Sequence, residues 1–305
     1  MGVKGSAGVF GVVMRWVCVL AVCALAAGAS SSSGSTILTR APGFDVRVFR
    51  FVDRTRTIRL PSGRRVPRTI ETIVRYPKGG GPHPLVVFGH GYTLTPARYA
   101  RLLRAWTLAG YVVAAPVFPL ENANAPGGPD ESDLVNQPAD MRLVITRLLA
   151  LNTHPGGVLE GAIDAARIAV AGHSDGAETA LAVAYDPRYR DRRVRAAIIL
   201  AGAELPHMGP FPRGSPPLLA VQGTADPINP PGDTYGFFRA APTPKFLLRL
   251  LGASHLPPFT DQEPQLGIVE RVTIAFLDHY LGHGTLPALL SAARDPGRTG
   301  FTANP

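Results

Sequence analysis

The sequence contains very little cysteine. Only 2 of its 305 residues are cysteines, Cys18 and Cys23, and both lie near the N-terminus. The chain beyond them has none, which excludes disulfides and cysteine-based metal sites from that part. Acidic residues at the spacing of a calcium loop are missing too. We therefore expect a protein without a metal or another cofactor.

A cluster of like charges is missing as well. The chain has 31 Lys and Arg against 22 Asp and Glu, a net charge of +9, but the arginines are spread along it. Because no basic run is interleaved with aromatic residues, a basic soluble surface is favoured over nucleic-acid binding. Attraction to anionic polymers or cell-wall material stays open as an alternative. A hydrophobic fraction of 46% supplies enough apolar material for a sizeable core.

The N-terminal apolar run is too short to span a bilayer comfortably. It covers ten residues, 17–26, whereas a spanning helix needs about 20. Lys4 and Arg15 precede it and a small-x-small cleavage pattern follows it, as in an export signal. We therefore predict a signal peptide over residues 1–29, a polar linker over 30–43, and a secreted protein without stable membrane insertion. An uncleaved membrane anchor is the alternative.

Strand and helix patterns fill most of the remaining chain. Short extended segments with tight turns between residues 44 and 76 predict an antiparallel edge of a larger sheet. Buried-strand patterns then alternate with helix patterns. This order predicts an α/β fold, with one mostly parallel sheet covered by helices on both faces. Strands are expected at residues 85–88, 111–115, 168–171, 195–200, 218–222 and 245–250, and helices at 95–108, 138–151, 177–184 and 264–281.

The same patterns set the domain limits. We predict one folded domain over residues 44–282. Residues 283–305 are rich in Gly, Pro and Ala and are predicted to form a loose C-terminal tail. Inside the domain, the loop over residues 120–137 is unusually long, and such loops are usually functional or mobile. This loop can be interpreted either as a flap over a site or as an ordinary surface loop.

The predicted domain is organised around the sequence Gly172-His173-Ser174-Asp175-Gly176. It has the form G-x-S-x-G and stands between a strand pattern and a helix pattern. Such a turn holds its serine in a strained conformation, with the hydroxyl exposed above the edge of the sheet. Ser174 is therefore our candidate nucleophile, and a simple turn of small residues is the alternative.

A serine hydroxyl needs a base to take its proton, and the base needs a third group to fix its tautomer. In this kind of fold the acid and the histidine follow later strands, in that order. Asp226 follows one such strand and His255 follows the last one, so we assign them these roles. Asp233 and Glu204 are the competing acids. The histidine inside the motif, residue 173, is expected to pack beneath the turn.

The intermediate of acyl transfer also needs donors for its oxyanion. The backbone N–H of Asp175 is the expected first donor. The second is expected from the loop Gly89-His90-Gly91-Tyr92, through the N–H of Tyr92. The Tyr92 ring would then bind substrate as a wall of the acyl pocket. A glycine-rich turn with a buried histidine is the alternative.

These motifs, in this order, resemble those of α/β-hydrolases. The nearer resemblance is to the branch that holds dienelactone-hydrolase-like enzymes, chlorophyllases, platelet-activating-factor acetylhydrolases and cutinase-like polyester hydrolases. Segments 72–77, 88–92 and 136–140 are similar in form to segments of those groups. The resemblance covers residues 44–281 and implies an α/β-hydrolase fold with a central sheet of about eight strands.

The resemblance implies a Ser–His–Asp triad, carried here by Ser174, His255 and Asp226. One residue departs from the pattern of these groups, which often have Met, Gln or Arg after the nucleophile, where this chain has Asp175. A carboxylate near a developing oxyanion opposes it unless it is turned away or paired. The departure concerns the substrate pocket rather than the triad.

The expected activity is hydrolysis of a carboxylic ester through an acyl-enzyme. The substrate is expected to be a small, lipid or polymeric ester, and the protein is expected to be a monomer. A binding protein on the same fold with a disabled site is one alternative, because a fold alone does not determine function. A peptidase or lyase that uses the same triad is another.

Overall fold

One sheet of nine strands runs through the part of the chain that this computed structural model describes, residues 43–305. The predicted signal peptide and most of the predicted linker lie outside these residues. The strands are β1 (Phe44–Arg59), β2 (Arg65–Pro77), β3 (His83–Gly89), β4 (Val112–Val117), β5 (Ile163–His173), β6 (Val194–Leu200), β7 (Leu218–Gly223), β8 (Lys245–Leu250) and β9 (Thr299–Asn304).

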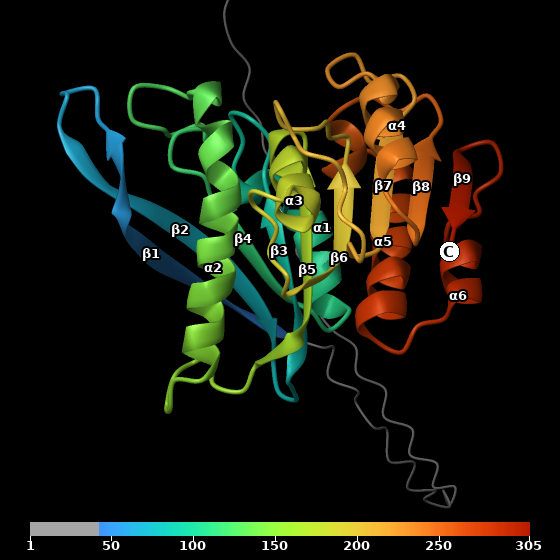
Figure 1. Cartoon of the computed structure of the whole chain (residues 1–305). Coiled ribbons are helices and arrows are strands. Elements are labelled where there is room, and N and C mark those ends of the chain that lie inside the picture. The colour runs from blue at the N-terminus through green and yellow to red at the C-terminus, as the bar shows by residue number, and fades with distance from the viewer. Residues whose placement is uncertain (1–42) are drawn as a thin grey trace, which may run out of the picture. The chain divides into compact units, whose positions relative to one another are not determined.

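The spatial order of the strands is β1-β2-β4-β3-β5-β6-β7-β8-β9 (Figure 1). Neighbours from β4 to β8 are parallel, while β1, β2 and β4 pair antiparallel at one edge and β9 pairs antiparallel with β8 at the other. The sheet is therefore mostly parallel with an antiparallel edge, as the sequence predicts. Because β3 to β8 are parallel, their carboxyl ends meet along one rim of the sheet.

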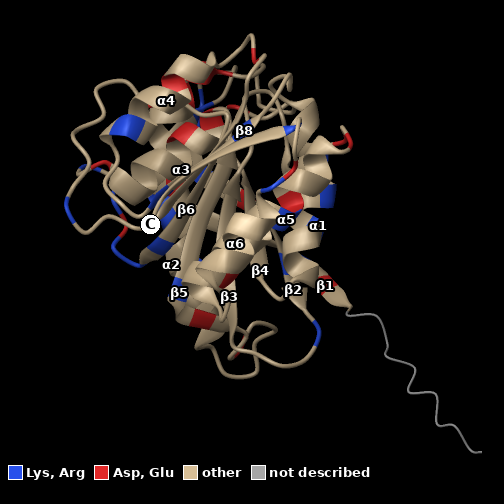
Figure 2. Ribbon diagram, turned by 90° about the vertical axis from the view of Figure 1, so that its right-hand side faces the viewer, with Lys and Arg blue, Asp and Glu red and all other residues tan. Residues whose placement is uncertain are grey.

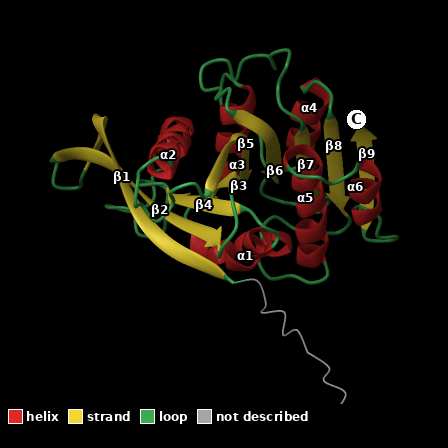
Figure 3. Cartoon of the chain, turned by 90° about the horizontal axis from the view of Figure 1, so that it is seen from below, coloured by secondary structure: helices red, strands yellow, loops and turns green. Residues whose placement is uncertain are grey.

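Six α-helices cover the two faces of this sheet within residues 43–305. They are α1 (Ala100–Leu108), α2 (Gln137–Asn152), α3 (Asp175–Tyr185), α4 (Pro231–Ala240), α5 (Gln265–Leu281) and α6 (Leu286–Ala292). Buried residues of α2, α3 and α4 share one core cluster, and those of α1, α5 and α6 share the other. Figure 3 shows α2 and α1 on opposite sides of the sheet. Every helix in this part of the chain is too short or too polar to span a membrane.

The central strands contain continuous apolar runs because helices cover both faces of the sheet. Along β3, Leu85 and Val87 point into one core cluster, whereas Val86 and Phe88 point into the other. Successive side chains of a strand face opposite sides, so a strand buried on both faces has no polar alternation. All four of these side chains are fully buried.

The predicted loose tail over residues 283–305 is wrong. This segment forms α6 and β9, and β9 adds a ninth strand beside β8, with Leu250 opposite Thr299. Leu289 of α6 is fully buried, and Phe301 of β9 stacks on Phe246. The strand consists of Thr, Gly, Phe, Thr, Ala and Asn, a composition without a clear strand pattern, and its pairing partner rather than its own propensity makes it a strand.

Other differences are local. The two extended segments expected between residues 44 and 60 form the single strand β1, which changes register between Asp53 and Thr57. The helix expected from residue 95 begins as a short 3-10 turn, Pro96–Tyr99, before α1. Thr95 has the extended conformation of an N-cap, but its side chain makes no capping hydrogen bond. Figure 2 shows basic and acidic residues distributed over many elements.

Candidate active site

Ser174 stands in the turn between β5 and α3, with φ at 55° and ψ at −126°. A positive φ is strained for a residue with a side chain, and such strain persists only where the surroundings impose it. Here the Ser174 N–H donates to the carbonyl of Leu200 at 3.1 Å, and the Ser174 carbonyl accepts from Ala177 N–H at 2.7 Å. The strand, sharp turn and helix that the motif predicts are all present.

Close backbone packing explains the two glycines of the motif. A Cβ on Gly172 would lie 2.0 Å from the carbonyl oxygen of Gly176, and a Cβ on Gly176 would lie 2.2 Å from the carbonyl group of Gly89. Both distances are far below any real contact with backbone atoms. The elbow therefore packs directly against the end of β3, which brings the glycine-rich loop after β3 beside Ser174.

Asp226 and His255 meet at the same rim of the sheet. Asp226 follows the end of β7, His255 follows the end of β8, and the His255 Nδ1 lies 2.8 Å from Asp226 Oδ2. The other carboxylate oxygen, Oδ1, accepts the backbone N–H groups of Ile228 at 2.9 Å and Asn229 at 3.0 Å. With Nδ1–H donated to a carboxylate, the Nε2 of His255 is left as the acceptor nitrogen.

The side chain of Gln222 helps to hold Asp226 in place. Gln222, at the end of β7, donates its Nε2–H to Asp226 Oδ2 at 3.2 Å, and its Oε1 accepts the Thr234 hydroxyl at 2.7 Å. Gln222, Thr234 and Asp226 are all buried. The competing acids, Asp233 and Glu204, are both exposed, and neither makes a hydrogen bond or ion pair with His255 within residues 43–305.

The histidine of the motif connects the elbow to the His255 loop. The Nε2–H of His173 donates to the backbone carbonyl of His255 at 2.9 Å, and the two rings lie 4.6 Å apart between centroids. Burial lowers the pKa of His173 to about 3, so its ring is neutral. Within the described residues, the Ser174 hydroxyl makes no hydrogen bond to the His255 ring. Such contacts often tighten only when substrate is bound.

Tyr99 is a site residue that the sequence did not single out. Its hydroxyl accepts the Gly91 N–H at 3.2 Å and donates to Nδ1 of His173 at 2.8 Å. It therefore links the loop after β3, the elbow and, through His173, the loop of His255. Tyr99 is fully buried at the end of the 3-10 turn that precedes α1. The sequence shows only an aromatic residue within a helix pattern, which is typical of a core position.

The loop after β3 passes close to Ser174. A Cβ on Gly91 would lie 3.1 Å from Ser174 Cβ, so only a glycine fits there easily. His90 is fully buried and braces the loop, since its Nε2 accepts the Phe118 N–H at 3.0 Å and its Nδ1 lies 2.9 Å from the Gly91 carbonyl. Tyr92 comes next in this loop, and Asp175, the first residue of α3, follows Ser174.

Tyr92 also contacts the long loop over residues 120–137. Its hydroxyl donates to the carbonyl of Pro129 at 3.2 Å, and the neighbouring Thr93 N–H donates to the Glu121 carbonyl at 2.8 Å. The long loop thus lies against the residue that is expected to line the acyl pocket. Residues Glu131–Asn136 of this loop form a short 3-10 helix.

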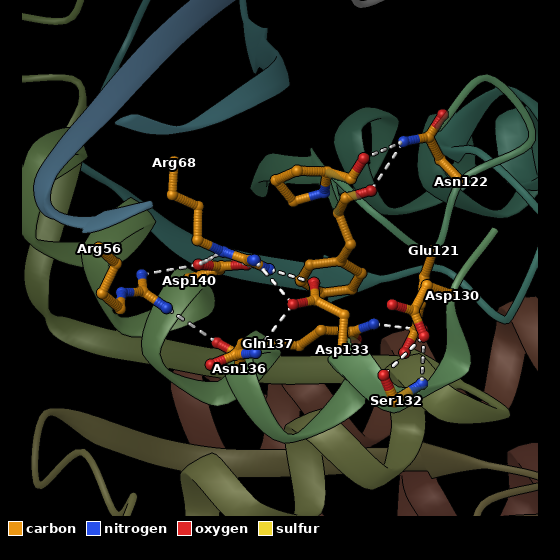
Figure 4. Close-up of polar contacts among 12 residues, drawn as sticks. Arg56, Arg68, Glu121, Asn122, Asp130, Ser132, Asp133, Asn136, Gln137 and Asp140 are labelled. Atoms are coloured by element: carbon orange, nitrogen blue, oxygen red, sulfur yellow. Dashed lines mark hydrogen bonds and ion pairs between the residues drawn. The ribbon is translucent and has the colours of Figure 1, made fainter. Parts of the chain in front are cut away.

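A buried ion cluster fixes the far end of the long loop to the sheet (Figure 4). Arg68 of β2 donates from Nη1 to Asp133 at 2.8 Å and from Nε to Asp140 of α2 at 2.8 Å. Arg56 of β1 reaches the same Asp140 at 2.7 Å. Arg68, Asp133 and Asp140 are each at most 5% exposed. The sequence did not indicate this cluster, because Arg56 and Arg68 each stand alone within a strand pattern.

Buried and half-buried carboxyl groups also lie around the start of α3. Burial raises the pKa of Asp175 to about 6, that of Glu178 to about 8 and that of Glu121 to about 9. Glu121 accepts a hydrogen bond from Gln137 Nε2 at the start of α2. The Gln137 Oε1 in turn accepts the hydroxyl of Thr179, one turn after Asp175, at 2.8 Å. The loop, α2 and α3 are therefore connected through this cluster.

Residues 52–201 match the model of the chlorophyllase family. The matched segment contains Tyr92 and Ser174 but ends before Asp226 and His255. No curated protein matches the chain. The match indicates a hydrolase with an esterase-like function. Together with the mostly parallel sheet flanked by helices, it confirms the resemblance found in the sequence to the α/β-hydrolase superfamily, and to the branch that holds the chlorophyllases.

Proposed function

We propose that this protein is a secreted serine hydrolase that cleaves carboxylic esters through an acyl-enzyme. The observation that carries the proposal is the contact of 2.8 Å between His255 and Asp226 at the rim where the strained Ser174 stands. This contact uses Nδ1 of His255 and leaves Nε2 available to a serine in a nucleophile turn.

In the proposed reaction, Ser174 Oγ attacks the ester carbonyl while His255 Nε2 takes the hydroxyl proton. Asp226 stabilises the resulting imidazolium, and the N–H groups of Tyr92 and Asp175 bind the oxyanion. His255 then gives the proton to the leaving alcohol as the ester bond breaks. Water, deprotonated by the same histidine, releases the acid from Ser174 and restores the free hydroxyl.

The test is the turnover of p-nitrophenyl esters of increasing acyl chain length, with a matched amide for one acyl group. We expect ester hydrolysis that Ser174→Ala abolishes while the variant stays folded. A folded wild type that hydrolyses none of these esters contradicts the proposal and favours a binding protein. Comparable turnover of the amide favours a peptidase.

Secretion is part of the proposal and is supported by the pattern of residues 1–29 alone. We expect the full chain, produced in an exporting host, to appear outside the cell with a new N-terminus close after Ala29. N-terminal sequencing of the exported protein tests this. A protein retained in the membrane with Met1 intact contradicts it.

A further inference from the structure

Two buried carboxyl oxygens beside the nucleophile lack a donor within residues 43–305. One is Oε1 of Glu121 and the other is Oδ2 of Asp175. Glu121 is 0% exposed and Asp175 is 7% exposed, so water does not satisfy them readily. Burial raises the pKa of Asp175, and the Glu121 side chain opposes this rise in the way that a hydrogen-bond donor does. Two carboxylates have no proton to share, so a hydrogen bond between them requires one of them to be a neutral acid.

The neighbouring amide shows where the proton belongs. The hydroxyl of Thr179 donates to Gln137 Oε1, which fixes the orientation of that amide, and Gln137 Nε2–H therefore donates to Glu121 Oε2. Oε2 is thus an acceptor, which leaves Oε1 as the Glu121 oxygen that can carry a proton, while Asp175 Oδ2 is a buried acceptor without a donor. Burial raises the pKa of Glu121 to about 9 and that of Asp175 only to about 6. At neutral pH Glu121 holds the proton and Asp175 is the carboxylate.

We propose that Glu121 is a positioning residue for ester hydrolysis: as a neutral acid it donates from Oε1 to Asp175 Oδ2 and keeps that carboxylate turned away from the oxyanion. The inference rests on the proposed function. It accounts for the aspartate that follows the nucleophile in this chain. The Asp175 N–H can serve the oxyanion while the charge of the same residue is bound by Glu121, which Gln137 and Thr179 hold in place.

Other titratable groups face this pair and belong in any account of its pH dependence. They come from the long loop, from α3 and from the loop after β8. These groups are Glu131, Asp133, Glu178 and His255. Asp133 is bound by Arg68, whereas Glu131 is exposed and makes no hydrogen bond to Asp175 within the described residues. Glu131 is therefore a matched control for a carboxylate that acts only by charge.

The first test compares Glu121→Gln, Glu121→Met and the control Glu131→Gln in ester turnover. The glutamine retains the geometry, because its oxygen accepts from Gln137 and its amide donates to Asp175. We expect Glu121→Gln to keep at least about a third of kcat and Glu121→Met to lose about 10-fold in kcat with little change in KM, the loss of one hydrogen bond to a charged group. In the Glu121→Met background, Asp175→Asn should recover most of this loss. Equal kcat in Glu121→Met and wild type overturns the proposal.

The second test needs no unstable variant. The kcat of the wild type should fall as the pH rises through about 9, because an ionised Glu121 repels Asp175 instead of donating to it. Glu121→Gln has no proton to lose, so this fall should be absent from its profile. Identical upper limbs in the two profiles overturn the proposal.

A third measurement separates this inference from the proposed function. Infrared spectra at neutral pH should show a protonated carboxyl band of Glu121, beside that of Glu178, that is lost in Glu121→Gln and kept in Glu131→Gln. If the band is absent in an active wild type, the proposal fails and the esterase does not. If the band is present in a folded protein that hydrolyses no ester, the proposed function fails and the catalytic role of Glu121 with it.

Discussion

Asp226 has one oxygen on His255 and the other on two backbone N–H groups, so its position is fixed by the turn that carries it. Asp226→Asn has the same shape, and its oxygen can still accept the two backbone N–H groups. Its amide NH2 then faces His255 and favours the tautomer in which Nδ1 is the acceptor and Nε2 carries the proton. We expect kcat for ester hydrolysis to fall by about 10³–10⁴-fold, with KM little changed. Steady-state kinetics on a soluble p-nitrophenyl ester measures this.

Asp233 supplies the control for this variant. It follows the same strand, is exposed at the start of α4 and does not touch His255. Asp233→Asn should leave kcat within about twofold of wild type, because a surface charge at a helix start contributes only about 0.3–1 kcal/mol of stability. A loss in Asp233→Asn as large as that in Asp226→Asn would show that the acid has been assigned wrongly.

His90 sets a pH dependence of stability. Burial lowers its pKa from 6.5 to about 4. The neutral ring is also the form whose Nε2 accepts a backbone N–H. Between these values the unfolded chain binds one proton more than the folded chain. Stability from His90 is therefore complete above pH 6.5 and is lost as the pH falls towards 4.

The variant His90→Gln can keep both hydrogen bonds without a titrating ring. As the pH falls through that window, the free energy of unfolding of the wild type should decrease relative to that of this variant, by up to about 1.4 kcal/mol per pH unit. Urea unfolding of both proteins at several pH values measures the difference, in which the raised pKa values of Glu121 and Glu178 cancel. A constant difference would mean that His90 does not titrate on unfolding.

Among the elements, the loop over residues 120–137 is held more firmly than a free flap. Arg68 binds Asp133 of the loop and Asp140 of α2, all of them buried. Arg68→Met leaves two buried carboxylates with fewer partners. We expect a loss of about 3–5 kcal/mol in the free energy of unfolding, measured by denaturant titration.

Arg50 is the matched control on the same antiparallel edge. It pairs with Glu71 at 3.2 Å, but its side chain is 76% exposed. Arg50→Met should cost no more than about 1 kcal/mol, since exposed pairs are weak. Similar losses in both variants would show that the buried cluster does not fix the loop.

Elements with strong local patterns were predictable, and those that depend on distant partners were not. The runs at 85–88 and 196–200 are apolar throughout because β3 and β6 are covered on both faces. The turn at Ser174 was predictable because the whole G-x-S-x-G motif stands between a strand pattern and a helix pattern, although Gly176 also packs against the distant Gly89 of β3. Tyr99 and Glu121 gained their importance only from residues far along the chain, and neither stands in a recognisable motif.

At the scale of the whole molecule, the C-terminal segment closes one edge of the sheet and one side of the core. Removing residues 283–305 would uncover β8, the buried surface against Leu289 and the stack on Phe246. We expect the truncated protein to lose more than about 3 kcal/mol of stability and to aggregate through the exposed strand.

Thermal unfolding and the soluble yield of the truncated protein measure this. Leu289→Ala keeps β9 and should lose about 2–5 kcal/mol while staying monodisperse. A truncated protein as stable and soluble as the full chain would contradict the account of this edge.

The central claim is that Ser174, Asp226 and His255, carried by three different strand ends, form one nucleophilic site. Labelling of the folded protein with a fluorophosphonate, followed by peptide mass mapping, tests it most directly. The account predicts a single adduct on Ser174, formed much more slowly in His255→Asn and not at all in Ser174→Ala. Folded wild type without an adduct, or Ser174→Ala labelled at the wild-type rate, would contradict it.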